Sequence, residues 1–84
     1  MEKLWSDRGW LDYLYWQEND KKILKRINAL IKDIERNGAM QGIGKPERLK
    51  HREAYSRRIN GEHRLIYELD NGYIYIFSCF GHYE

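Results

Sequence analysis

Two Asn-Gly dipeptides in the second half of this chain restrict its possible folds more than any other feature. Asn60-Gly61 and Asn71-Gly72 each separate segments that are rich in β-branched and aromatic residues. Such dipeptides favour tight turns between antiparallel strands, because Asn and Gly both tolerate positive φ angles. The second half is therefore predicted to be an antiparallel meander. Its predicted strands comprise residues 47–50, 55–59, 63–69 and 73–83.

The first half has the pattern of two helices. An apolar stripe at helical spacing predicts the second helix, with Asp20 as its cap and Asn37-Gly38 at its end. The stripe consists of Ile23, Ile27, Leu30, Ile31 and Ile34. The first helix is predicted over residues 7–18, capped by Ser6 or Asp7, after a short strand at residues 3–6.

Aromatic residues are concentrated in the first predicted helix. Trp10, Leu11 and Leu14 lie at helical spacing and are expected to face the core. The aromatic side chains there are interpreted mainly as core, although Tyr15 and Trp16 are also candidates for an interface. The set comprises Trp10, Tyr13, Tyr15 and Trp16.

These elements predict an α+β fold: an N-terminal strand and a two-helix hairpin packed on a twisted, mainly antiparallel sheet. The length of 84 residues leaves room for one domain, residues 1–84, with one modest core. No apolar run is long enough to cross a membrane, and the first residues lack the apolar segment of a secretory signal. The single cysteine, Cys79, is expected in the core and excludes an internal disulfide framework. The expected location is the cytoplasm.

Basic residues are concentrated in one segment of the chain. Residues 45–64 hold seven Lys and Arg against three Asp and Glu, and no Lys or Arg follows Arg64. A local basic segment next to aromatic residues indicates an anionic partner. The alternative is a solvated surface with no partner, which is the usual meaning of a charge run.

The residue types in this segment and at the chain's end suit cleavage of a phosphodiester. Cleavage of a phosphodiester needs a base, an acid and cations for the phosphorane charge. Glu47 supplies a carboxylate, which is ordinarily ionised at neutral pH, and His82 supplies an imidazole, which is ordinarily partly protonated. Alternation along the strands predicts that Arg58 and Arg64 share one open face that His82 can reach.

Each of these residues also has a simpler interpretation. Glu47 can be a solvated carboxylate, and Arg64 can form an ion pair with Glu62 or Glu68. A histidine close to the end of a chain, as His82 is, is often part of a loose tail. No metal site is predicted, because the scattered histidines and the cysteine lack zinc-ligand spacing. These residues are His51, His63, His82 and Cys79.

Several motifs together resemble the YoeB/Txe family of bacterial toxins, within the wider RelE-like group. The resemblance covers essentially the whole chain. It rests on Trp5-Ser6, residues 10–17 and 27–33, Gly44 to His51, Ser56 to Ile59, Glu62 to Tyr67 and the terminal His82-Tyr83.

The resemblance implies a ribosome-dependent endoribonuclease that cleaves messenger RNA in the A site by attack of the 2′-hydroxyl, without a metal or cofactor. It implies Glu47 as general base, Arg64 as the residue that stabilises the transition state and His82 as general acid. It also implies a substrate-binding set. This set comprises Lys50, His51, Arg58 and Tyr83.

The implied partners are the 70S ribosome, messenger RNA and an antitoxin of the YefM/Phd type, and the family suggests a homodimer. The chain departs from the family pattern at Ala54-Tyr55, where a Gly-x-Trp element is usual, in a shorter loop after His51, and at the extra Glu84. These departures leave two alternatives open: an RNA- or ribosome-binding module with weakened catalysis, and an antitoxin-binding module that acts in operon repression.

Overall fold

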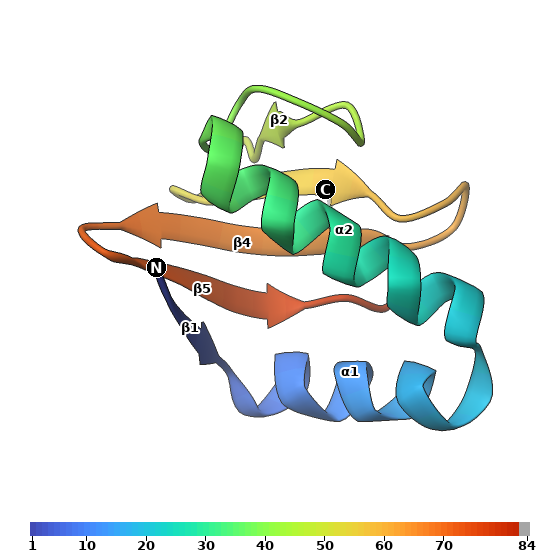
Figure 1. Ribbon diagram of the computed structural model, residues 1–84. Coiled ribbons are helices and arrows are strands. Elements are labelled where there is room, and N and C mark those ends of the chain that lie inside the picture. Colours follow the sequence, from blue (N-terminus) through green and yellow to red (C-terminus); the bar gives the residue numbers. More distant parts are fainter. Residues whose placement is uncertain (83–84) are drawn as a thin grey trace.

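The computed structural model describes residues 1–82, which form two helices and a five-stranded sheet (Figure 1). The elements in chain order are β1 (Glu2–Trp5), α1 (Asp7–Asn19), α2 (Lys21–Asn37), β2 (Glu47–Arg48), β3 (Tyr55–Arg58), β4 (Arg64–Asp70) and β5 (Tyr73–Ser78). Among these residues, no helix is long and apolar enough to cross a membrane.

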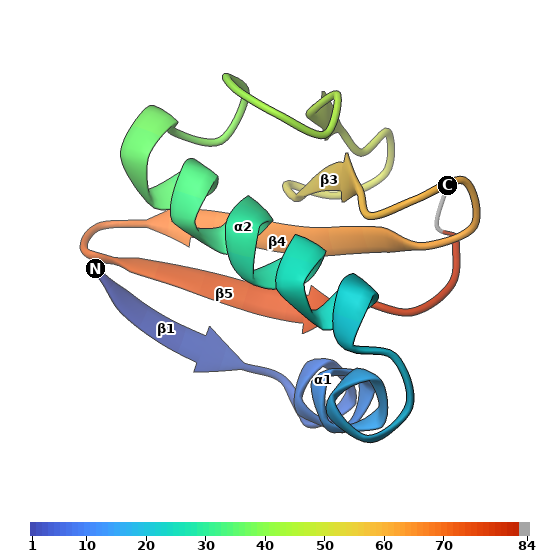
Figure 2. The ribbon, with the colours of Figure 1, turned by 45° about the vertical axis from the view of Figure 1, so that its right-hand side comes forward.

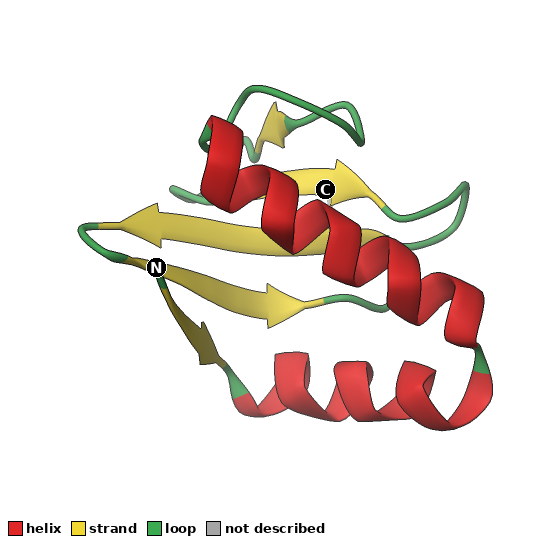
Figure 3. Cartoon of the chain, in the orientation of Figure 1, coloured by secondary structure: helices red, strands yellow, loops and turns green. Residues whose placement is uncertain are grey.

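The sheet has the strand order β1-β5-β4-β3-β2. Strands β2 to β5 are antiparallel neighbours, whereas β1 runs parallel to β5 at the edge. The helix α2 crosses one face of the sheet, and α1 packs against β5 and α2 beside the β1 edge (Figures 2 and 3). This arrangement confirms the predicted α+β fold with a helical hairpin on a mainly antiparallel sheet.

The helices begin where short polar side chains accept backbone hydrogen bonds. Ser6 Oγ accepts from Gly9 N at 2.9 Å, so Ser6 is the cap of α1. Asp20 Oδ1 accepts from Lys22 N and Ile23 N, while its own N–H donates to Trp16 O. A single residue therefore ends α1 and starts α2, which holds the two helices close together.

The two Asn-Gly dipeptides form turns by different means. Asn71-Gly72 closes a two-residue turn, since Asp70 pairs with Tyr73 and Gly72 has a φ of +84°. The other loop spans residues 59–63, because the last pair across it is Arg58 with Arg64. There the side chain of Asn60 organises the turn by accepting from the N–H groups of residues 62 and 63 at 2.8 Å.

The final strand is shorter than predicted. It ends at Ser78 instead of continuing to residue 83, because the backbone groups of Cys79 bond to side chains of α1. Cys79 N donates to Asp12 Oδ2 at 3.0 Å, and Trp16 Nε1 donates to Cys79 O at 2.8 Å. Regular pairing with β4 therefore stops before His82, and one backbone hydrogen bond, from Arg64 N to Gly81 O, still joins this segment to β4.

The buried face of α1 also differs from the prediction. Trp10 and Leu11 are exposed, and the buried positions are Gly9, Asp12 and Trp16. A Cβ atom on Gly9 would lie 2.5 Å from the carbonyl oxygen of Ile76, so only glycine allows this approach of helix to strand. Close contact with β5 and the polar bonds to residue 79 decide which face is buried.

The main core lies between α2 and the sheet. It contains the predicted stripe residues Ile27, Leu30, Ile31 and Ile34, which pack with side chains of β4 and β5. Cys79 is fully buried in this core, as predicted, and burial, followed by the negative charge of Asp12, raises the pKa of its thiol to about 12. Cys79 is thus a packing residue and not a reactive thiol.

Candidate active site

The loop between α2 and β2, which precedes Glu47, is held by a buried arginine. The Arg57 side chain has no exposed surface and lies on the helix side of β3. It donates hydrogen bonds to the carbonyl oxygens of Gly38, Gln41 and Ile43 at 2.6–2.9 Å, and to the hydroxyl of Tyr67. A glycine-rich loop without secondary structure therefore acquires a defined path to the strand that bears Glu47.

Arg57 also forms an ion pair with Asp33 of α2, at 2.5 Å between Nη1 and Oδ2. The Asp33 carboxylate accepts further hydrogen bonds from Ile43 N and Asn37 Nδ2. Its side chain is 17% exposed. Sequence reasoning did not single out Arg57. The signal for its buried role is the alternation along β3, which places Arg57 on the same side as Tyr55 and Ile59 and opposite to Arg58.

This ion pair predicts acid sensitivity. The hydrogen bond from Arg57 holds the pKa of Asp33 below its usual value of 3.8, although burial acts in the opposite direction. The stabilisation is therefore complete above the unfolded-state pKa and is lost as the pH falls through the lower folded-state pKa. We expect the melting temperature of native protein to exceed that of Asp33→Asn most near neutral pH. Thermal unfolding followed by circular dichroism from about pH 7 to about pH 2 measures this difference. If the melting temperatures of the two proteins fell equally as the pH was lowered, this prediction would be contradicted.

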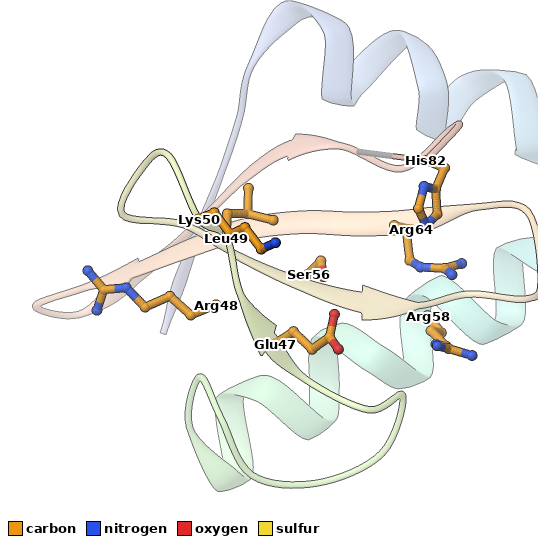
Figure 4. A pocket seen from close by; sticks show the side chains of 8 residues that line it. All are labelled: Glu47, Arg48, Leu49, Lys50, Ser56, Arg58, Arg64 and His82. Carbon is orange, nitrogen blue, oxygen red and sulfur yellow. The ribbon is translucent and has the colours of Figure 1, made fainter. Parts of the chain in front are cut away.

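A shallow pocket opens on the other face of the sheet, where residues of β2, β3 and β4 meet His82. Its volume is about 150 Å³. The lining residues are Glu47, Arg48, Leu49, Lys50, Ser56, Arg58, Arg64 and His82. Figure 4 shows Glu47, Arg58, Arg64 and His82 projecting to the same side, whereas Arg48 points away. Arg48 pairs instead with Glu53 at 3.3 Å.

Strand register explains why the two arginines meet. Arg58 and Arg64 occupy directly opposed positions of β3 and β4, so their side chains emerge from the same face. Within residues 1–82 neither forms an ion pair, and the alternative pairing of Arg64 with Glu62 or Glu68 is absent. Opposed like charges destabilise a sheet unless an anion compensates for them. The pair is therefore suited to hold a phosphate.

Arg64 is partly fixed before any ligand binds. Its Nη1 donates to the carbonyl oxygens of Asn60 at 2.8 Å and of His63 at 3.2 Å. These bonds direct one edge of the guanidinium toward the loop at residues 59–63. A guanidinium held in this way loses less conformational entropy when it binds a phosphate bidentately.

Glu47 lies at the pocket on β2, the strand next to β3. It pairs with Ser56, and Ser56 in turn pairs with Ile66. The Glu47 side chain is exposed and has no ion-pair partner among residues 1–82. Ser56, nearly buried at the pocket floor, is a lining residue that the sequence did not single out as a candidate.

The segment after β2 covers the rest of this face and contains the departure from the family pattern. Ala54 is fully buried in a small cluster with Leu49 and Ile66, and Leu49 N donates to Ala54 O at 2.8 Å. Tyr55 lies on the opposite face, with its ring 5.8 Å from that of Tyr67. Ala54 and Tyr55 therefore fill ordinary packing positions and leave the pocket open.

Two of the predicted substrate-binding residues lie at the pocket. Lys50 and Arg58 line the pocket. His51 lies in the exposed bend that follows and is not among the lining residues. Tyr83 lies outside the described residues. Within residues 1–82, no group of three or more His, Cys, Asp or Glu side chains is placed to bind a metal ion.

The pocket thus joins a carboxylate, two guanidinium groups, an ammonium group and an imidazole from separate parts of the chain. Cations of this kind attract a phosphate, and the carboxylate and imidazole can exchange protons with groups next to it.

Comparisons with known proteins cover nearly the whole chain. A family described as "YoeB-like toxin of bacterial type II toxin-antitoxin system" matches residues 5–83. Toxin YoeB of Escherichia coli (strain K12) is 51% identical over 85 residues, which are 99% of this chain and 100% of that relative.

Two solved structures from Staphylococcus aureus share the fold at 52% identity, and each alignment covers 99% of this chain and 98% of that chain. A YoeB dimer has a TM-score of 0.95, and a YoeB-YefM complex has a TM-score of 0.93. These alignments include the strands that bear the pocket residues.

Proposed function

The chain belongs to the YoeB-like toxins of bacterial type II toxin-antitoxin systems, and we propose that it is an endoribonuclease that cleaves messenger RNA in the ribosomal A site. One observation carries this proposal. A carboxylate, an imidazole and two opposed arginines line a single pocket. The two arginines have no ion-pair partner among residues 1–82. This is the set that 2′-hydroxyl attack on a phosphodiester requires.

In the proposed reaction, Glu47 removes the proton of the 2′-hydroxyl, and the resulting oxygen attacks the adjacent phosphorus. Arg64 and Arg58 bind the non-bridging oxygens, whose charge increases in the phosphorane. His82 donates a proton to the 5′-oxygen as its bond to phosphorus breaks. The products are a 2′,3′-cyclic phosphate, which water can open to a 3′-phosphate, and a free 5′-hydroxyl. Lys50 contributes a further positive charge at the rim.

The small size of the pocket supports ribosome dependence. A cavity of about 150 Å³ contacts little of an RNA chain, and the net charge of +2 adds little general attraction. Cleavage therefore depends on a ribosome that holds the codon in the reactive geometry. This role places the protein in the cytoplasm.

The partners follow from the family. We propose a YefM/Phd-type antitoxin, whose acidic and apolar segment would order on binding and cover the basic face, and a homodimer of the toxin. The solved YoeB-YefM complex and YoeB dimer of S. aureus support both assignments.

The deciding experiment is incubation of native protein with a defined messenger RNA, free or on programmed 70S ribosomes. We expect a cut in the A-site codon that leaves a 2′,3′-cyclic or 3′-phosphate end, and no comparable cut in free RNA. Ribosome binding without cleavage would instead support the binding-module alternative. Rapid degradation of free RNA at physiological salt would contradict ribosome dependence.

A further inference from the structure

The segment that bears His82 lies beyond the end of β5, and hydrogen bonds fix its backbone. Residue 79 is bonded to α1 through Asp12 and Trp16. Gly81, directly before His82, is bonded at both of its peptide groups. Its N–H donates to Nδ1 of His63 at 2.9 Å, and its carbonyl oxygen accepts from Arg64 N at 2.9 Å.

His63 itself packs against two aromatic rings, those of Trp16 and Phe80. Its ring centroid lies 4.8 Å from that of Trp16 and 4.8 Å from that of Phe80. The two aromatic rings stack on each other with centroids 5.1 Å apart. These contacts restrict rotation of the half-buried imidazole, so Nδ1 stays directed at Gly81. Because Nδ1 accepts a hydrogen bond, the hydrogen of the neutral ring is on Nε2.

We propose that His63 is a positioning residue for His82, an inference that rests on the proposed function. Its hydrogen bond to Gly81 N fixes the peptide from which the His82 side chain projects toward the pocket. Arg64 bonds to the same peptide segment and also lines the pocket. The backbones of the proposed acid, His82, and of the proposed phosphate-binding residue, Arg64, are thereby fixed relative to each other. Proton transfer requires contact at about 2.6–3.2 Å, and a displacement of about 1 Å costs about 10²-fold in rate.

Two variants separate the hydrogen bond from the ring contacts. His63→Phe keeps a ring against Trp16 and Phe80 but removes the acceptor. His63→Asn removes the ring and offers Oδ1 close to the former position of Nδ1. We expect His63→Phe to lower kcat for cleavage on programmed ribosomes by about 10–10²-fold, with KM and melting temperature near native values. His63→Asn should recover most of this rate, even though it lowers the melting temperature.

The variants are repeated in a protein that already has His82→Gln. If His63 acts through His82, His63→Phe should have little further effect in that background, because the effects of linked residues are not additive. An equal loss of rate in both backgrounds, or cleavage by His63→Phe at the native rate, would overturn the proposal. So would an NMR spectrum of native protein in which Nδ1 of His63 bears the hydrogen. Absence of cleavage by native protein would instead refute the proposed function.

Discussion

Replacement of His82 by glutamine is expected to slow cleavage of messenger RNA on programmed ribosomes by about 10²–10⁴-fold, the usual contribution of a general acid or base. Glutamine can still donate a hydrogen bond in the pocket but cannot transfer a proton to the 5′-oxygen. Because His82 is exposed at the pocket and outside the core, the variant should remain folded and bind ribosomes. Glu47→Gln should cause a loss of similar size, since it removes the base and leaves the shape of the side chain. The measurement is the single-turnover rate at saturating ribosome concentration.

His51→Gln is the matched control for this experiment. His51 is another exposed histidine in the basic segment, but it is not among the residues that line the pocket. If it contacts substrate, as the family resemblance implies, its replacement should raise KM and not lower kcat. A loss of kcat as large as that of His82→Gln would contradict the assignment of His82 as the acid.

The second large effect concerns stability. Arg57→Met is expected to lower the free energy of unfolding by about 3 kcal/mol or more, because several buried or half-buried acceptors lose the hydrogen bond that Arg57 donates to them. The affected groups are the Asp33 carboxylate, the Tyr67 hydroxyl and the carbonyl oxygens of Gly38, Gln41 and Ile43. For a domain of this size, the loss corresponds to a fall of roughly 10–20 °C in melting temperature.

Arg58→Met provides an internal control, because the residue type is the same and the position is the next in the chain. Arg58 is exposed on the opposite face, where it faces Arg64. Its replacement should change the free energy of unfolding by no more than about 0.5 kcal/mol and slow cleavage by about 10²-fold. Thermal unfolding and ribosome cleavage measured on both variants give the comparison. Equal losses of stability at the two positions would contradict the division of roles between the faces of β3.

Buried Arg57 holds the loop between α2 and β2 in place. Residues 38–44 bond to Arg57 through three carbonyl oxygens and bring the chain to Glu47. Gly44 has a φ of +85°, and a Cβ atom there would lie 2.7 Å from the side chain of Leu30, so the loop also depends on glycine for its path. The position of the proposed base therefore depends on packing on the other face of the sheet.

Much of the fold was predictable from local sequence features. The stripe from Ile23 to Ile34, the cap at Asp20 and the turn at Asn71-Gly72 each depend on residues within a few positions of one another, and the structure confirms all three. Alternation in β3 and β4 also placed Arg58 and Arg64 on one face correctly. Such features depend on backbone geometry and short-range hydrogen bonds, which are the same in any fold that contains them.

Three features depended on contacts between elements that are distant in the sequence: the buried face of α1, the end of β5 and the different environments of Arg57 and Arg58. The apolar residues Trp10 and Leu11 predicted one face of α1, but contacts with β5 bury Gly9 and Asp12 instead. Alternation continued past Ser78, but bonds from residue 79 to α1 end the strand there. Arg57 and Arg58 look alike in the sequence, yet one is buried and the other lines the pocket. Local sequence features were enough to predict the helices and strands and to supply residue types that suit phosphodiester cleavage, because these are local properties. Only packing determined which face of each element is buried, because that depends on partners far away in the chain.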